Sequence, residues 1–203
     1  MAAKKLRLKG FKNVHFAKTG VAGAYEVPTH LTGGKKVNIE LKYESEDFES
    51  DDMIDEQEYI FMGGDGGLTL KSLLPDEYEL LFGNTVDGGE VAIRTTDIAP
   101  NGALLFERQK RNSNAKRLYV IYNTKFAPSA IAAESAGKGG GDIDEELKFA
   151  IGEADDNLVV YFIDTDIATE PQKLKIAKWY EEVQFPGTSE TSQTLKLKQN
   201  MNK

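Results

Sequence analysis

The chain has 203 residues, of which 40% are hydrophobic and 29% charged, a composition typical of a folded globular protein. It contains no cysteine, which excludes disulfides and thiolate metal sites. No apolar run approaches the roughly 18 residues of a transmembrane helix, so no membrane association is expected. The length predicts one domain over residues 1–186, followed by a flexible polar C-terminal arm at 187–203.

The net charge of −8 is unevenly distributed along the chain. The first 25 residues hold six basic residues and no acid, residues 44–58 hold nine acids and no base, and 108–117 is basic again. These runs are either solvated loops or patches that meet between copies, the acids of one copy against residues 4–18 or 108–117 of another. The acidic balance argues against nucleic-acid binding, which needs surplus lysine and arginine.

Most of the chain reads as short strands separated by turns. Val14 and Phe16 flank His15, and apolar residues alternate with polar ones over 37–43, which is the period of a half-buried strand. Other segments are rich in β-branched and aromatic residues, at 59–62, 103–106, 118–122, 147–151 and 158–163. The pattern predicts a mainly β fold, either a β-sandwich or a small barrel.

The acidic segment 44–58 lies between two of these strands and is predicted as an extended loop, because its like charges oppose compaction. Three large apolar residues interrupt it, and a purely solvated loop has little use for them. We therefore expect the loop to dock on a neighbouring copy through a set of residues at its centre. That set is Phe48, Asp51, Asp52, Met53, Ile54 and Asp55.

A flanking helix is predicted to begin at Pro75, because proline suits the first turn of a helix. Asp76 and Glu77 then place negative charge at the positive end of the helix dipole, and Gly83 is suited to end the helix. The helix and its apolar face are predicted from one group of residues: Leu74, Pro75, Tyr78, Leu81 and Phe82.

A second, short C-terminal helix is predicted over about 171–183. Ile176, Tyr180 and Val183 form a helical stripe there, with Trp179 beside it. A strand is the alternative, since Leu174 and Ile176 also alternate with polar residues.

No residue pattern predicts a catalytic, cofactor-binding or metal-binding site. The segment 137–142 lacks the hydroxyl residue, the strand and the helix of a phosphate-binding loop. Ser135 is no hydrolase nucleophile, because His15 and His30 both precede it; we expect both histidines at the surface or in a sheet. Two histidines make a poor zinc site, and the acids at 44–58 lack the spacing of a calcium loop. The chain is therefore not expected to be an enzyme.

Five segments recur in an order that resembles a known family. They are GFKNVHFA at 10–17, LPDEYELLFG at 74–83, VDGG at 86–89, KRLYVIYNTKF at 116–126 and AKWYEEVQFP at 177–186. In this order they resemble the major tail protein, or tail tube protein, of long-tailed phages with non-contractile tails that infect Gram-positive bacteria. The resemblance covers about residues 8–186 and rests on the order of the segments.

The resemblance implies a structural virion protein, made in the host cytoplasm and located in the virion tail. Six copies would close into a ring, and rings would stack into a hollow tube through which the genome leaves. A long hairpin or loop between early strands, which corresponds to residues 44–58, would contact the next ring. The implied partners are further copies, the tape measure protein, the tail terminator and the distal tail proteins, while DNA passes without specific binding. The alternative is a β-sandwich binding module for carbohydrate or a host surface.

Overall fold

The computed structural model describes residues 5–20, 23–50, 53–128, 131, 133 and 143–187, and at 47–50 and 53–56 it describes the backbone alone. Asp51, Asp52, Ser135 and the C-terminal arm from residue 188 onward lie outside the described residues. What was predicted for them remains a prediction.

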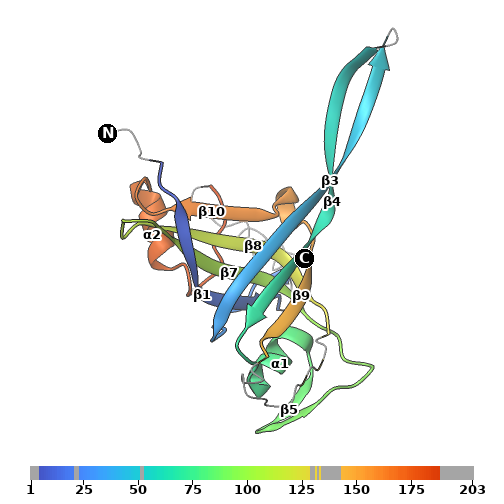
Figure 1. Cartoon of the computed structure of the whole chain (residues 1–203), viewed down its shortest axis with the longest axis vertical. Helices are drawn as coiled ribbons and strands as arrows, with labels where there is room; N and C mark the ends of the chain where they lie inside the picture. Colours follow the sequence, from blue (N-terminus) through green and yellow to red (C-terminus); the bar gives the residue numbers. More distant parts are fainter. Residues whose placement is uncertain are drawn as a thin grey trace, which may run out of the picture.

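The strand-like segments pair into one strongly bent, antiparallel, eight-stranded sheet (Figure 1). The strand order is β2-β1-β7-β8-β9-β4-β3, and β10 also pairs with β8. The strands of this sheet are β1 (Leu8–Lys18), β2 (Thr29–His30), β3 (Gly34–Ser50), β4 (Met53–Leu70), β7 (Asn101–Lys110), β8 (Lys116–Phe126), β9 (Glu145–Ile151) and β10 (Val160–Asp164). A separate two-stranded sheet is formed by β5 (Thr85–Asp87) and β6 (Glu90–Ala92).

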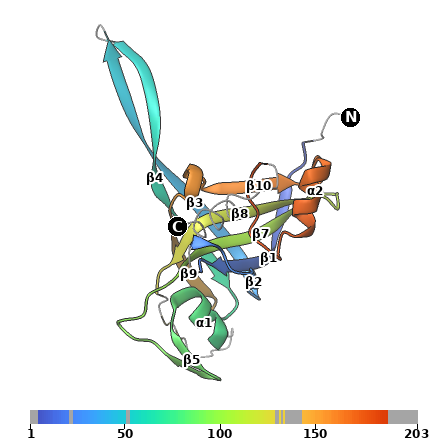
Figure 2. The ribbon, with the colours of Figure 1, turned by 180° about the vertical axis from the view of Figure 1, so that it is seen from behind.

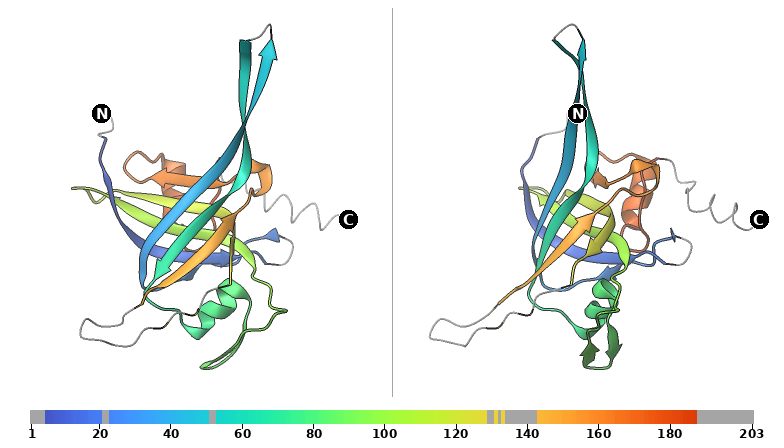
Figure 3. Two further views of the ribbon diagram at one scale, coloured as in Figure 1. Left: turned by 45° about the vertical axis from the view of Figure 1, so that its right-hand side comes forward. Right: turned by 90° about the vertical axis from the view of Figure 1, so that its right-hand side faces the viewer.

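The long strand β8 divides the sheet into two layers. Its first part, Arg117–Ile121, pairs with β10, whereas Thr124–Phe126 pairs with β9 on the same side. Asn123 lies between the two stretches with a φ of 42°. Strands β9, β4 and β3 therefore fold over the layer formed by β1, β7, β8 and β10 (Figure 3). The mainly β prediction is confirmed, and the two layers give the fold a sandwich character.

One hydrophobic core fills the space between the two layers. It is formed by the inward side chains of both layers, together with two residues of the first helix: Val14, Phe16, Leu68, Leu70, Leu81, Phe82, Leu104, Phe106, Ile121, Phe126, Leu147, Phe149 and Ile151. The rings of Phe16 and Phe126 meet edge to face with their centroids 5.3 Å apart, and Phe149 lies 5.3 Å from Phe126 on the other side. Burial of these apolar side chains supplies most of the driving force for folding.

A second core covers the other face of β7 and β8. There Leu105, Val120 and Tyr122 pack against Trp179 and Val183 of the C-terminal segment. Strand β7 is consequently buried on both faces, which explains why its sequence at 103–106 is continuously apolar instead of alternating. Figure 2 shows this C-terminal segment on the far side of the sheet from the hairpin of β3 and β4.

The flanking helix α1 spans Pro75–Phe82, as predicted, and Gly83 ends it in the left-handed conformation with φ 70° and ψ 24°. The Glu77 carboxylate accepts a hydrogen bond of 2.8 Å from the Leu74 backbone N–H, which caps the first turn. Leu81 is fully buried, whereas Leu74 is 55% exposed. The assignment of Leu74 to the buried face was wrong because this residue precedes the helix in an extended conformation.

The C-terminal helix α2 is shorter than predicted and spans Glu170–Ala177, with turns in place of helix after Lys178. The strand alternative is wrong. None of the eight residues of α2 is buried, and the anchors of this segment are Trp179 and Val183 beyond it. The chain must leave the helix axis to direct both side chains onto the sheet. This explains why α2 ends earlier than predicted. A 3₁₀ turn, η2 (Asp155–Asn157), precedes β10.

Gly66 should be irreplaceable in β4, because a Cβ atom there would lie 2.1 Å from the ring of the buried Phe149. We expect Gly66→Ala to lower the free energy of unfolding by about 1–3 kcal/mol through overpacking. The matched control is Gly67→Ala, whose Cβ would meet its nearest atom only at 4.0 Å. Urea denaturation of both variants checks this, and equal stabilities would show that the Phe149 ring does not press on β4.

Candidate functional site

The most unusual feature is a two-stranded ribbon that leaves the body of the protein (Figures 1 and 3). Strands β3 and β4 pair from Gly34 and Leu70 out to Ser50 and Met53. The last pair between β4 and β9 is Gly64 with Ile151, and beyond it no third strand of the described part of the chain flanks the ribbon. A lone two-stranded hairpin is only marginally stable in water. A projection of this kind is therefore the first candidate for an interaction site.

The described residues of the acidic segment, 44–50 and 53–58, form the outer part of this ribbon, so the extended loop predicted from their charge was wrong, and they belong to a long hairpin. Successive side chains of a strand point to opposite faces, and an acidic run is therefore compatible with strand pairing. Four residues of the predicted contact set have paired or flanking strand positions: Phe48 lies opposite Glu56, Met53 opposite Ser50, Ile54 opposite Glu49, and Asp55 at the register shift between these pairs. Asp51 and Asp52 lie outside the described residues.

The register gives the ribbon an aromatic face, which comprises Tyr43, Tyr59 and Phe61. Tyr43 lies opposite Phe61, and their ring centroids are 5.6 Å apart in an edge-to-face arrangement. Tyr59 is 66% exposed and Tyr43 53% exposed. Exposed aromatic rings grouped on one surface are typical of a contact site.

The opposite side of the ribbon is an acidic face, which comprises Glu44, Glu46 and Glu58. Glu46 lies directly opposite Glu58, and like charges in such a pair destabilise a sheet. Ile60 lies opposite Glu44 on the same face. The ribbon would therefore be stabilised by a partner that covers the aromatic face and brings cations to the acidic face.

The ribbon is joined to the body by an irregular but fixed connection. The register shifts between Leu41 and Tyr43, and Gly63 in the opposite strand adopts a φ of 102°, which L-residues rarely adopt. Next to this shift Lys42 forms an ion pair with Asp65 across the two strands. A bulge of this type bends a strand pair and sets its direction.

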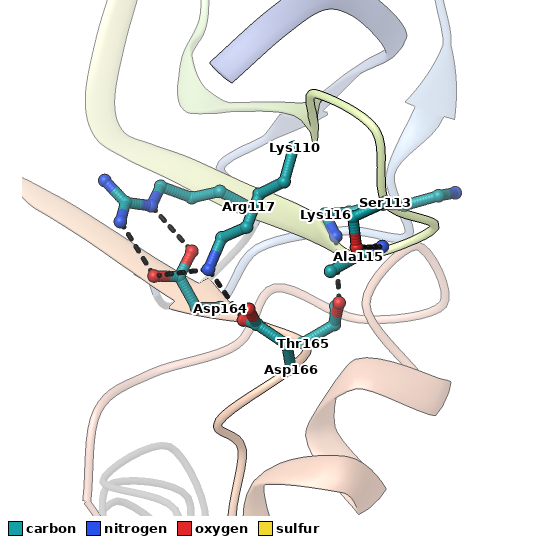
Figure 4. Close-up of polar contacts among 8 residues, drawn as sticks. All are labelled: Lys110, Ser113, Ala115, Lys116, Arg117, Asp164, Thr165 and Asp166. Atoms are coloured by element: carbon teal, nitrogen blue, oxygen red, sulfur yellow. Dashed lines mark hydrogen bonds and ion pairs between the residues drawn. The ribbon is translucent and has the colours of Figure 1, made fainter. Parts of the chain in front are cut away.

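A network of ion pairs lies where β10 meets the turn between β7 and β8 (Figure 4). Asp164 accepts two hydrogen bonds of 2.7 Å from Arg117, and Lys110 lies 3.3 Å from Asp164 and 2.6 Å from Asp166. The Arg117 guanidinium also lies 4.6 Å from the centre of the Phe162 ring. The hydrogen bonds from Arg117 lower the pKa of Asp164, since they stabilise the charged carboxylate. This network clamps β10 to the turn between β7 and β8.

This network changes which basic residues within 108–117 are candidates for contact with an acidic neighbour. Lys110 and Arg117 are paired within their own chain, and Lys116 lies 2.8 Å from Glu107. These three side chains are therefore already engaged within their own chain, which makes them poorer candidates for binding an acidic neighbour. Sequence reasoning missed the network because its partners are separated by 47 and 56 positions along the chain, and no local pattern links residues so far apart.

The two histidines lie in the sheet, which is one of the two environments predicted for them. The His15 ring is 4.7 Å from that of His30 and stacks on Tyr180 at 4.3 Å. Burial lowers the pKa of His15. Tyr180 donates a hydrogen bond of 3.2 Å to Glu107. This cluster attaches the C-terminal segment to β1 and β7, and among the described residues no group of three or more His, Asp or Glu side chains is arranged to hold a metal ion.

A hollow of about 400 Å³ beside α1 is lined by Tyr78, Phe82, Ile93 and Ile131. Asp97, one of the carboxylates that line the hollow, accepts hydrogen bonds of 2.7 Å from the Arg94 backbone and 2.8 Å from Asn84. The bond from the Arg94 backbone contributes most to lowering the pKa of Asp97. This carboxylate is thus used to hold its own loop.

No described helix is both long enough and apolar enough to cross a bilayer. No protein-family model matches the chain, and no curated protein matches it as a relative.

Asp164→Ala should destabilise the protein by about 3 kcal/mol, because it leaves the buried Lys110 and the half-buried Arg117 short of a partner. Asp144→Ala removes the exposed pair with Lys35 and should cost less than about 1 kcal/mol. Urea denaturation measures both.

The contribution of Asp164 to stability also depends on pH. Since the folded pKa of Asp164 is depressed, this contribution is complete above the unfolded pKa of about 3.9 and is lost as the pH falls through the lower folded pKa. The stability difference between wild type and Asp164→Asn should therefore shrink below about pH 4. A difference that stays constant with pH would contradict the assigned role of the Asp164 carboxylate.

Proposed function

We propose that the protein is the subunit of a phage tail tube, in which copies form rings and stacked rings form a hollow conduit for the genome. The observation that carries this proposal is the projecting ribbon, which exposes an aromatic and an acidic face beyond the body of the subunit. The resemblance of the five ordered segments supports it independently. The role is structural and uses no catalytic residue, cofactor or metal.

The charge distribution supports a partner of the same sequence. The acidic face of the ribbon carries Glu44, Glu46 and Glu58, while Lys9 and Lys12 on β1 belong to the basic N-terminal segment. One surface that complements a different surface of the same chain gives head-to-tail contacts, which generate rings and filaments. Charge complementarity of this kind sets the register and orientation of the copies.

The edges of the sheet also favour assembly into a ring. Among the described strands, β10 pairs only with β8 and the projecting part of β3 pairs only with β4, so each has an unpaired edge. Exposed strand edges tend to pair with other chains unless they are blocked. In the proposed ring, neighbouring copies cover these edges, and six copies per ring follow from the resemblance.

The proposed location is the virion tail, after assembly in the host cytoplasm. The tape measure protein would lie inside the tube, and the tail terminator and distal tail proteins would bind its two ends. DNA would pass without specific binding, consistent with a chain of net charge −8.

The second candidate function is a β-sandwich module that binds carbohydrate or a host surface. The exposed rings of Tyr43 and Tyr59 favour it, because aromatic rings provide stacking surfaces for such ligands. Trp179, however, is 1% exposed and belongs to the second core, so it offers no binding surface. A binding module would remain a small, defined oligomer at every concentration.

Replacing the aromatic face tests the proposal. We expect the double variant Tyr43→Ser and Tyr59→Ser to fold normally but to need a roughly tenfold higher concentration to assemble, since buried aromatic residues dominate protein contacts. Leu174→Ser is the matched control, because Leu174 is 72% exposed on α2, away from the ribbon.

Sedimentation velocity over a concentration series measures assembly, and circular dichroism verifies folding. If the double variant assembles at the same concentrations as the wild type, the aromatic face takes no part in the contact. A wild-type protein that stays a monomer or trimer throughout would favour the binding module.

A further inference from the structure

The outer edge of β3 is open along the ribbon. At 43–46 its backbone pairs with β4 on one side, and no described strand lies on the other. A strand added at this edge would have one side next to Tyr43 and Ser45, on the aromatic face, and the other next to Glu44 and Glu46, on the acidic face. Such strand addition is a common mode of peptide recognition.

The two faces define which strand fits this edge. Side chains of a strand alternate between faces with a period of two residues. The fitting strand therefore carries apolar residues at alternate positions and basic residues between them, so that each face receives complementary side chains.

The chain contains three segments with this alternation, at 6–9, 173–176 and 195–198. The first leads into β1, which pairs with β7 from Leu8 onward, and the second belongs to α2. The third, Leu195, Lys196, Leu197 and Lys198, lies beyond the described residues, and no described strand or helix contains it.

We propose that residues 195–198 of a second copy pair with the open edge of β3. Leu195 and Leu197 lie against the aromatic face, and Lys196 and Lys198 face Glu44 and Glu46. This inference rests on the proposed function, since it requires a neighbouring copy. It also narrows the charge complementarity proposed above, because Glu44 and Glu46 then face the lysines of the C-terminal arm in place of Lys9 and Lys12.

The position of the C-terminal segment favours a second copy over the same chain. Phe185 stacks on Tyr122 at 5.3 Å, and Lys175 donates a hydrogen bond of 2.6 Å to the Gly187 carbonyl. These contacts fix the end of the described chain on the face of β8 opposite to β3 and β4 (Figure 2). Residues 188–194 reach at most about 25 Å, and a path to the chain's own ribbon must go around a sheet edge.

Engineered cysteines test this pairing cleanly, because the chain has none of its own. Full-length Glu44→Cys is mixed with full-length Lys196→Cys, assembled and oxidised. We expect a disulfide-linked pair that contains one chain of each type. Glu44→Cys with Lys173→Cys, on the exposed surface of α2, is the matched control and should not cross-link.

Charge reversal provides a second readout in the same assembly assay. Lys196→Glu with Lys198→Glu should raise the concentration needed for assembly roughly tenfold. Adding Glu44→Lys and Glu46→Lys to the same chain should restore it, an effect that a loss of folding cannot produce.

The outcomes separate the two proposals. Polymers without the cross-link and without charge rescue would overturn the pairing and leave the tube proposal standing. A double variant with Glu44→Cys and Lys196→Cys in the same chain provides a third arm: a cross-link within that chain, in place of one between chains, would overturn the second copy as the occupant. Protein that forms no polymers at any concentration would overturn the proposed function, and the pairing with it.

Discussion

The architecture depends on one row of paired residues across three strands. Ile151, the last residue of β9, pairs with Thr124 of β8 on one side and with Gly64 of β4 on the other. Next to this row, Asn123 and Gly63 both adopt positive φ values, which mark the points where β8 changes partner and where the ribbon begins. Because β9 stops here, β8 becomes free to pair with β10, while β3 and β4 continue without a neighbour.

The row therefore separates a stable body from an extension that is not self-sufficient. On one side β7 and β8 are buried on both faces, by the inner core and by Trp179 and Val183. On the other side the ribbon exposes Tyr43, Tyr59 and Met62. The proposed polymerisation would move that apolar surface out of water, which is the usual driving force for protein association.

Features set by local chemistry were predictable from the sequence. The helix α1 followed from Pro75, the acids after it and Gly83, since each acts on its own turn. The predictions for Leu74 and for the length of α2 were wrong, because both features depend on where neighbouring residues pack. Leu74 precedes the helix, and Trp179 directs the chain onto the sheet.

Features set by pairing between distant segments were not predictable. The charge of 44–58 indicated a loop, whereas the register with β4 makes it part of a ribbon with two distinct faces. The partners of Lys110 and Arg117 were likewise hidden, because Asp164 and Asp166 lie far along the chain. In both cases an acidic or basic run gave the sign of the charge, and only the strand register determined what that charge faces.

Electron microscopy of the purified full-length protein, negatively stained at rising concentration, tests the central claim most directly. The account predicts rings at low concentration and hollow tubes at high concentration, with tube length increasing as protein is added. Particles that keep the size of a monomer or trimer at every concentration would contradict it.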